Sequence, residues 1–239
     1  MILVLDAGNA RIKWGLWADG FVAHGSIPSE RAAQLFDALH VHARPSRAIG
    51  CNVAGPQVRQ HVEAALQGWR MPVEWIASRA EQCGVRSRYE DPVQLGSDRW
   101  AALIGTHARR LGDAVVVDCG TAVTVDALAG DGEFLGGLIL PGIALMQHAL
   151  ARGTAELPLG GGVFEPFPRN SANAIYSGAV QAICGAIERM RTLLLARGAD
   201  HASVVLCGGD AQVVAPLLTP APLFAPALVL EGLVEITRA

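Results

Sequence analysis

The chain has 239 residues, of which 51% are hydrophobic, and its 19 basic and 22 acidic residues give a net charge of −3. A chain of this length can bury a sizeable core, and it divides naturally into two lobes of about 110–120 residues each. Because the sequence has no block of basic residues, we expect no nucleic-acid partner.

The cysteines and the charge-poor stretches indicate where in the cell the protein is located. The five cysteines are odd in number, widely spaced and without a Cys-x-x-Cys pair, which argues against a disulfide framework or a zinc site. Asp6 interrupts the first apolar run too early for a signal peptide. The charge-poor stretches 134–151 and 211–230 contain glycine, proline or polar residues, so we interpret them as buried core and connecting loops. We therefore expect a cytoplasmic protein without a membrane partner.

The first half predicts three strands followed by alternating helices and strands. Apolar residues 2–5 lead into Asp6-Ala7-Gly8-Asn9, residues 11–17 alternate, and Asp19-Gly20 is typical of a hairpin turn into strand 21–27. Ser29 is typical of a cap for a helix to about His42. Further elements are expected in this order: strand 48–53, helix 56–67, strand 73–76 and a helix from Gly96 through Leu111.

The second half begins in the same way. The run Leu5-Asp6-Ala7-Gly8-Asn9-Ala10 recurs as Val117-Asp118-Cys119-Gly120-Thr121-Ala122. Strands are expected over 114–118, 122–128, 134–140 and 203–207, with a long helix from Ser171 to about Arg197. A single Asp-x-Gly after a strand is most often an ordinary β-turn, but a repeat at this spacing favours two copies of one lobe.

These patterns predict an α/β fold of two ribonuclease-H-like lobes, each with a β-β-β-α-β-α-β core, flanking a central nucleotide cleft. We expect the lobes to cover residues 1–112 and 113–239. The arrangement resembles the actin, hexokinase and chaperone-ATPase superfamily. In both turns the carboxylate could address a metal ion, while backbone amides brought close by glycine could bind phosphate.

Five sequence blocks in a fixed order resemble type III pantothenate kinase across essentially the whole chain. The blocks are Asp6-Ala7-Gly8-Asn9, Gly96-Ser97-Asp98-Arg99, the run 118–126, the run Gly136 to Gly142, and Asn170-Ser171 before a helix that contains Gly178. The resemblance implies ATP-dependent phosphorylation of pantothenate, the first step of coenzyme A biosynthesis. It also implies Mg²⁺ with the ATP, a monovalent cation (K⁺ or NH₄⁺) and a homodimer formed through the second lobe.

The resemblance assigns roles to individual residues. Asp98 is the expected catalytic base, Arg99 pairs with the carboxylate of pantothenate or with the transferring phosphoryl group, Asp6 holds Mg²⁺ through water, and Asp118 binds the monovalent cation. The expected ATP-binding residues are Asp6, Ala7, Gly8, Asn9, Ala10, Arg11, Ile12, Lys13 and Thr121. The expected substrate-binding residues are Tyr89, Gly96, Ser97, Asp98, Arg99 and Ser171.

Simpler interpretations of several residues stay open. Gly96-Ser97-Asp98-Arg99 in isolation is typical of a capped surface helix with a solvated arginine. Tyr89 could be half-buried packing, Ser171 a helix N-cap, and Asp126 a turn or surface residue or a support for the cation site. The apolar helix 171–197 could form a dimer interface or be buried within one chain. Ala10 and Ser171 also depart from the family, which often has Thr or Ser at the first position and Thr at the second.

Two other functions compete with pantothenate kinase. One is a related phosphotransferase or polyphosphate hydrolase of the same superfamily, which Gly96-Ser97-Asp98-Arg99 disfavours. The other is a nucleotide-binding regulatory factor that retains the fold with little or no catalysis. The presence of Asp6, Asp98, Arg99 and Asp118 argues against that factor, because a scaffold does not need these charges.

Overall fold

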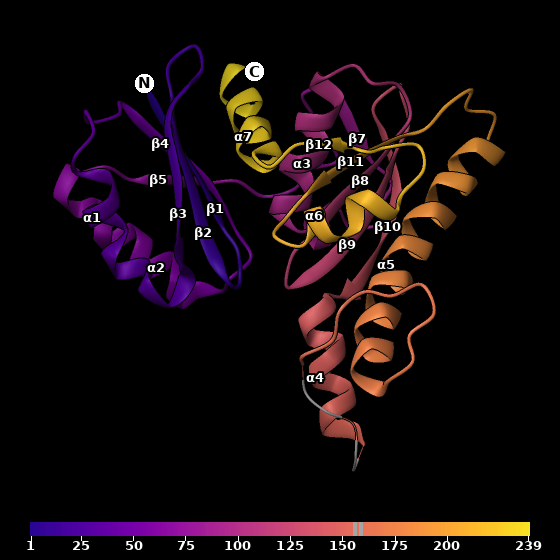
Figure 1. Cartoon of the computed structure of the whole chain (residues 1–239). Coiled ribbons are helices and arrows are strands. Elements are labelled where there is room, and N and C mark those ends of the chain that lie inside the picture. Colours follow the sequence, from indigo (N-terminus) through magenta and orange to yellow (C-terminus); the bar gives the residue numbers. More distant parts are fainter. Residues whose placement is uncertain (155–156, 158–159) are drawn as a thin grey trace. The chain divides into compact units, whose positions relative to one another are not determined.

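The computed structural model describes residues 1–154, 157 and 160–239 of the chain. The chain forms two compact units: unit 1 comprises Met1–Arg109 together with Ala227–Ala239, and unit 2 comprises Arg110–Pro226 (Figure 1). The units differ from the expected lobes in two respects: the boundary lies after Arg109 and not after residue 112, and residues 227–239 belong with the first half of the chain.

Unit 1 is built on a mixed five-stranded sheet in the order β3-β2-β1-β4-β5. Strand β1 pairs antiparallel with β2 and parallel with β4, while β3 and β5 complete the two sides. The alternation of residues 11–17 correctly predicted the second strand. The strands are β1 (Ile2–Ala7), β2 (Arg11–Trp17), β3 (Phe21–Pro28), β4 (Arg47–Asn52) and β5 (Val73–Trp75).

The two faces of this sheet have different neighbours. Leu3, Leu5 and Ala7 pack in one core with buried residues of helices α1 (Leu35–Leu39) and α2 (Pro56–Ala65). Because side chains alternate along a strand, Asp6 lies on the opposite face. Helix α7 (Leu228–Arg238) contacts β1, β2 and β4, and Figure 1 shows it across the sheet from α1 and α2.

The remaining elements of unit 1 are short, apart from helix α3. They are the 3₁₀ segments η1 (Ser29–Gln34), η2 (Leu66–Trp69) and η3 (Pro92–Gln94), the antiparallel pair β6 (Glu81–Gln82) and β7 (Val85–Ser87), and α3 (Ser97–Ala108).

The expected helix from Ser29 to about His42 is only partly correct. The chain forms the 3₁₀ segment η1 and then the short helix α1, and the Ser29 side chain does not cap the helix. Its hydroxyl donates instead to the carbonyl oxygen of Gly8, 2.6 Å away. The hydroxyl is thus directed towards the Gly8 turn, and Ser29 lies inside η1 after its N-cap Pro28, so it does not have the capping role that the sequence pattern predicted for it.

Helices α3 and α7 pack together through two glycines. A Cβ atom at Gly232 would collide with the carbonyl oxygen of Ala101, and one at Gly105 would lie 2.7 Å from the carbonyl oxygen of Leu228. The ion pair between Arg109 and Glu231 joins the same helices, with Nη2 and Oε2 2.5 Å apart. Since α3 begins at Ser97, this close packing also fixes the helix that carries Asp98 and Arg99.

Unit 2 repeats the sheet of unit 1. Its strands lie in the order β12-β11-β8-β9-β10, so the central strand again has one antiparallel meander on one side and parallel strands on the other. The expected duplication is therefore present. The strands are β8 (Ala114–Cys119), β9 (Ala122–Leu128), β10 (Glu133–Pro141), β11 (Ser203–Cys207) and β12 (Leu223–Phe224).

The helices of unit 2 are α4 (Ile143–Gly153), α5 (Ser171–Ala196) and α6 (Ala211–Val214), with the 3₁₀ segment η4 (Ala215–Leu217). Helix α5 supplies one wall of the core against β8 and β9, and it extends beyond the sheet alongside α4 (Figure 1). The interpretation of residues 134–151 and 211–230 as core and loops missed α4 and α7. Among the described helices, none is both long and apolar enough to span a bilayer.

Candidate active site

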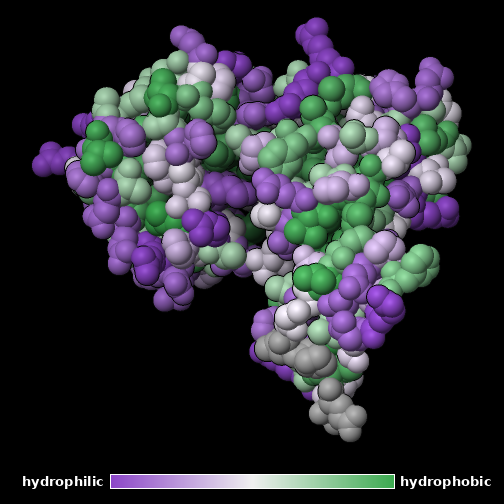
Figure 2. Space-filling view, in the orientation of Figure 1, coloured by the Kyte–Doolittle hydropathy of each residue, from purple (hydrophilic) through white to green (hydrophobic). Residues whose placement is uncertain are grey.

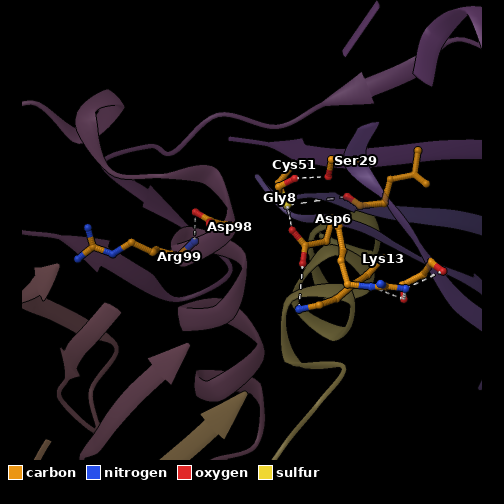
Figure 3. Close-up of polar contacts among 10 residues, drawn as sticks. Asp6, Gly8, Lys13, Ser29, Cys51, Asp98 and Arg99 are labelled. Carbon is orange, nitrogen blue, oxygen red and sulfur yellow. Dashed lines mark hydrogen bonds and ion pairs between the residues drawn. The ribbon is translucent and has the colours of Figure 1, made fainter. Parts of the chain in front are cut away.

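A buried carboxylate lies at the carboxyl end of the central strand of unit 1. Asp6 is 6% exposed, and the Lys13 Nζ atom lies 3.5 Å from its Oδ2 atom (Figure 3). Asp6 and Lys13 are direct cross-strand neighbours in the β1–β2 ladder. Burying a charge is costly unless an opposite charge lies beside it, so the register of this hairpin supplies the compensation that Asp6 needs.

The second oxygen of Asp6 has a neighbour on the other side of the strand. Cys51 is aligned with Asp6 in the parallel β1–β4 ladder, and its Sγ lies 3.5 Å from Asp6 Oδ1. Burial, followed by the negative charges of Asp6 and Asp98, raises the pKa of Cys51 well above its usual value. The protonated thiol therefore acts as the donor. Sequence reasoning missed this contact because it requires knowing that β4 lies beside β1 in this register.

The turn after Asp6 is tight and held by backbone hydrogen bonds. The Gly8 N–H donates to the carbonyl oxygen of Arg11 over 3.1 Å. A Cβ atom at Gly8 would lie 3.3 Å from that same oxygen, closer than most side chains tolerate, so glycine suits the position. Asn9 and Ala10 are exposed at the tip. The turn thus places backbone amides next to a paired carboxylate, as a phosphate site requires.

Asp98 and Arg99 lie in the first turn of helix α3. The Arg99 N–H donates to Asp98 Oδ1 over 2.8 Å, and Arg99 is only 6% exposed. The interpretation of this tetrapeptide as a surface helix with a solvated arginine is therefore wrong. Gly96 precedes the helix, where a Cβ atom would lie 2.6 Å from Asp98 Oδ1, so the absence of a side chain there leaves room for the carboxylate.

Tyr89 packs against Arg99. Arg99 Nη1 donates to the Tyr89 hydroxyl over 3.3 Å, and the guanidinium carbon lies 5.9 Å from the centre of the tyrosine ring. The phenol is half-buried. The contact combines a hydrogen bond with a cation–π geometry, so it orients the guanidinium group before any ligand is present.

Burial dominates the electrostatics of Asp98. Burial raises the pKa of this carboxyl above its ordinary value, against the opposing effects of the Arg99 N–H and of the Arg99 and Lys13 charges. Lys13 therefore acts on both Asp6 and Asp98, and Cys51 responds to the same two carboxylates. Unit 1 thus brings together Asp6, Lys13, Asp98, Arg99 and Tyr89, all predicted from sequence.

Unit 2 carries the second Asp-x-Gly turn. Asp118 ends β8, and its cross-strand neighbour on β9 is Thr124, at the position that Lys13 has beside Asp6. Gly208 has a φ of +93°, and a Cβ atom there would collide with Asp118 Oδ1. The Asp210 N–H donates to the carbonyl oxygen of Cys119 over 3.0 Å. The loop after β11 is therefore packed directly on this turn.

The charges at this second turn are predominantly negative. Burial raises the pKa of the Cys119 thiol to about 12, with further contributions from Asp118, Asp210 and Cys184. Burial also raises the pKa of Asp210. The carboxylates of Asp118 and Asp210 thus lie close enough to influence one thiol.

Three other predicted residues of unit 2 have defined local roles. Thr121 is exposed in the turn, and its carbonyl oxygen accepts from the Gly142 N–H over 2.9 Å. Ser171 is the exposed first residue of α5, whereas Asn170 is the N-cap, accepting from the Asn173 N–H over 2.9 Å. Asp126 is 2% exposed on β9, so a turn or surface role for it is wrong. A shared site of Asp118, Thr121 and Ser171 with Asp98 stays a prediction.

The donor set suits a loosely held divalent ion better than a dedicated metal cage. Within the part of the chain that the structure describes, no three His, Cys, Asp or Glu side chains gather as metal ligands. Mg²⁺ commonly binds to proteins through one or two carboxylates, with water and substrate phosphates completing its shell. Asp6, beside an amide-rich turn, fits that pattern.

Comparison with known proteins identifies relatives over the full chain. Residues 2–192 match the sequence profile of a family described as Type III pantothenate kinase. A protein named Type III pantothenate kinase from Aromatoleum aromaticum is 45% identical, covering 100% of this chain and 98% of its own. One of the same name from Nitrosospira multiformis is 42% identical, covering 100% of this chain and 91% of its own.

Solved structures share the fold at lower identity. A Campylobacter jejuni protein titled a conserved putative Baf family transcriptional activator has a TM-score of 0.63 at 22% identity, covering 99% of this chain and 97% of its own. A putative 2-dehydro-3-deoxygalactonokinase from Sinorhizobium meliloti has a TM-score of 0.62 at 16% identity, covering 100% of this chain and 98% of its own. At these identities the likeness shows the fold alone.

The raised pKa of Asp98 predicts that this residue destabilises the protein at neutral pH. The folded protein holds the proton more tightly than the unfolded chain, so stability falls as pH rises from the unfolded pKa, about 3.9, through the higher folded pKa. Asp98→Asn removes this penalty while its amide oxygen can still accept from the Arg99 N–H. We expect the variant to melt above the parent at pH 7.

The measurement is the melting temperature of both proteins from pH 4 to pH 7.5. The advantage of Asp98→Asn should grow with pH across that range. Asp37→Asn, an exposed substitution on α1, is the matched control and should give a constant difference from the parent. A variant that melts below the parent at pH 7 would contradict the prediction.

Proposed function

The chain belongs to the type III pantothenate kinase family, and from that membership we propose how its residues transfer a phosphoryl group from ATP to pantothenate. Pantothenate phosphorylation in coenzyme A biosynthesis is the function of this enzyme. Such a transfer requires alignment and neutralisation of charge more than covalent chemistry. The observation that carries the proposal is the grouping of two carboxylates, a lysine and a buried arginine in unit 1.

The phosphate end of the site is the first Asp-x-Gly turn. Asp6 holds the water shell of Mg²⁺, and residues Ala7 to Lys13 line the phosphates, with backbone amides as the donors. The bound Mg²⁺ supplies charge neutralisation at the phosphate oxygens. Lys13, 3.5 Å from Asp6, offers a second positive charge that can move from the carboxylate to a phosphate oxygen when ATP binds.

The acceptor end is the start of helix α3. Asp98 accepts the proton of the primary hydroxyl of pantothenate, and its raised pKa makes it a stronger base than an exposed aspartate. Arg99, oriented by Tyr89, pairs with the pantothenate carboxylate or the transferring phosphoryl group. From the family resemblance we also assign Gly96, Ser97 and Ser171 to the binding of pantothenate.

We assign the monovalent cation, K⁺ or NH₄⁺, to Asp118, with Thr121 as a phosphate contact. The support is the family resemblance and the acidity of the second turn. Where Asp6 has Lys13 as its cross-strand neighbour, Asp118 has the neutral Thr124, and Asp210 adds a second carboxylate nearby.

The first test is the kinase reaction itself with Asp98→Asn. ADP release is followed by a coupled assay with ATP, Mg²⁺ and K⁺, with and without pantothenate. The parent should release ADP only with pantothenate, and Asp98→Asn should lower kcat by about 10²–10⁴-fold because the proton acceptor is gone. Asp37→Asn is the control and should match the parent. Turnover of Asp98→Asn within a few-fold of the parent removes Asp98 from the base role.

The second test concerns the monovalent cation. In buffers containing only Na⁺ or tetramethylammonium, turnover should collapse, and K⁺ or NH₄⁺ should restore it. Asp118→Asn should raise the K⁺ concentration needed for half-activation, because a neutral amide is a poorer ligand for a hard cation than a carboxylate. Equal rates in all four salts would exclude the assignment.

We also propose a homodimer formed through unit 2. The sequence pattern suggested the apolar helix α5 as a possible dimer interface. In the structure, however, Ile183, Ile187 and other apolar residues of that helix are buried in the core of unit 2. Support comes instead from exposed apolar side chains on β10, α4 and the segment before α5. Figure 2 shows hydrophobic residues among polar ones where α4 and α5 protrude. The exposed residues are Leu138, Ile139, Leu145, Leu150, Val163 and Phe167.

Light scattering tests this interface. The protein should have twice the single-chain mass of 25.1 kDa at micromolar concentration. Leu145→Glu on α4 should shift it towards the single-chain mass, because the charge would be buried without a partner. Val41→Glu, at a more exposed apolar residue in unit 1, is the control and should leave the mass unchanged. A parent that stays at 25.1 kDa with full activity would exclude the dimer.

The alternative of a regulatory factor without catalysis gains no support. The Campylobacter jejuni structure titled a putative transcriptional activator is similar in fold only, at 22% identity. The curated relatives at 45% and 42% identity are named as kinases. We propose a cytoplasmic location, since all five cysteines are free thiols, which suits a reducing compartment.

A further inference from the structure

Ser29, which lies outside the Asp-x-Gly motif, forms hydrogen bonds with the first Asp-x-Gly turn. Ser29 directly follows β3 and is 5% exposed. Its hydroxyl donates to the carbonyl oxygen of Gly8 over 2.6 Å (Figure 3). Its N–H donates to the carbonyl oxygen of Ala10 over 3.0 Å. The two accepting carbonyls lie on either side of Asn9, so a single residue holds both ends of the tip.

These bonds determine which way the amides of the turn point. A peptide unit is planar and trans, so its C=O and N–H groups point in opposite directions. With the Gly8 carbonyl held by the Ser29 hydroxyl, the Asn9 N–H is directed away from Ser29. With the Ala10 carbonyl held by the Ser29 N–H, the Arg11 N–H is directed away likewise. Amides fixed in this way can bind an anion without first paying the entropy of ordering the turn.

The side chains of the turn offer little help of their own. Gly8 has none, and Ala10 has no hydroxyl. Within the turn, the Gly8 N–H donates to the Arg11 carbonyl oxygen. The Ser29 hydroxyl is therefore the polar side-chain group that holds the Gly8 peptide in place.

We propose that Ser29 is a positioning residue for the triphosphate of the nucleotide: its buried hydroxyl sets the Gly8–Ala10 turn so that the backbone amides are ready to bind phosphate. The inference rests on the proposed function, since it deepens the role given to the same turn. Ser29 itself need not touch the nucleotide, because its effect passes through the Gly8 carbonyl.

The chain contains a matched control for this bond. Ser46 donates from its hydroxyl to the carbonyl oxygen of Met1 over 3.0 Å, and its N–H donates to the same oxygen over 2.9 Å. It therefore makes the same kind of contact as Ser29, at the opposite end of strand β1. Ser46→Ala removes a serine-to-carbonyl bond from the same sheet without touching the turn.

The probe is Mg·ADP, and its affinity is measured by titration calorimetry on the full chain. Ser29→Ala should raise the Kd for Mg·ADP and the KM for ATP by about five- to tenfold, the range expected for losing one buried hydrogen bond. The KM for pantothenate should stay within about twofold of the parent. Hydrogen exchange in the peptide covering residues 7–13 should become faster without nucleotide. Ser46→Ala should change none of these values.

The outcomes separate the inference from the function. If the parent does not phosphorylate pantothenate but Ser29→Ala still weakens Mg·ADP binding, the function is wrong and the positioning role stands. If the parent is an active kinase and Ser29→Ala binds Mg·ADP like the parent, the positioning role is wrong. Equal weakening by Ser46→Ala also overturns it, because the effect would then be general.

A second variant covers the case in which Ser29→Ala does not fold. Ser29→Cys keeps a similar shape and leaves only a weak donor, so the same rise in the Kd for Mg·ADP is expected at reduced size. A Kd equal to that of the parent in a folded Ser29→Cys protein would overturn the proposal.

Discussion

The pairing of Asp6 with Lys13 is the interaction on which the arrangement of unit 1 depends. Strand alternation places Asp6 on the sheet face opposite α1 and α2, where it is almost completely buried. A buried charge of this kind persists only beside an opposite charge or donors, and the hairpin register provides Lys13 while the parallel register provides Cys51. The charge of Lys13 also acts on Asp98, and the charges of Asp6 and Asp98 both act on Cys51, so these four side chains are electrostatically connected.

The duplicated turns share a backbone and differ in charge. Both follow the central strand of a sheet with the same strand order. At the equivalent cross-strand position one turn has a lysine and the other a threonine. The carboxylate of the first turn therefore has a positive charge beside it in the ladder, whereas the carboxylate of the second turn has a neutral hydroxyl at that position. Two halves with similar backbones can thus differ in the charge at their turns through one residue, Lys13 in the first half and Thr124 in the second.

Much of the fold could be predicted from sequence, because apolar alternation and Asp-x-Gly turns are local signals. The strands 122–128 and 203–207 have the predicted bounds, and the site residues of unit 1 were named from short motifs. The contacts of Cys51 and Ser29 could not be predicted, since each depends on which strand lies beside which. Helix α7 was not predicted, because the four prolines before it suggested loops. Its packing partner α3 is also distant in the sequence, so no local pattern indicated the contact.

The place of α7 in unit 1 has a consequence for the order in which the protein can be made. Residues 227–239 are synthesised after unit 2, yet they pack on α3 of unit 1, where Gly232 lies against Ala101. While the chain is still emerging from the ribosome, the helix that carries Asp98 lacks this partner, even though unit 2 is already complete in sequence. Unit 1 therefore cannot complete its packing until unit 2 has been translated, and removing residues 227–239 would take away the helix that packs on α3.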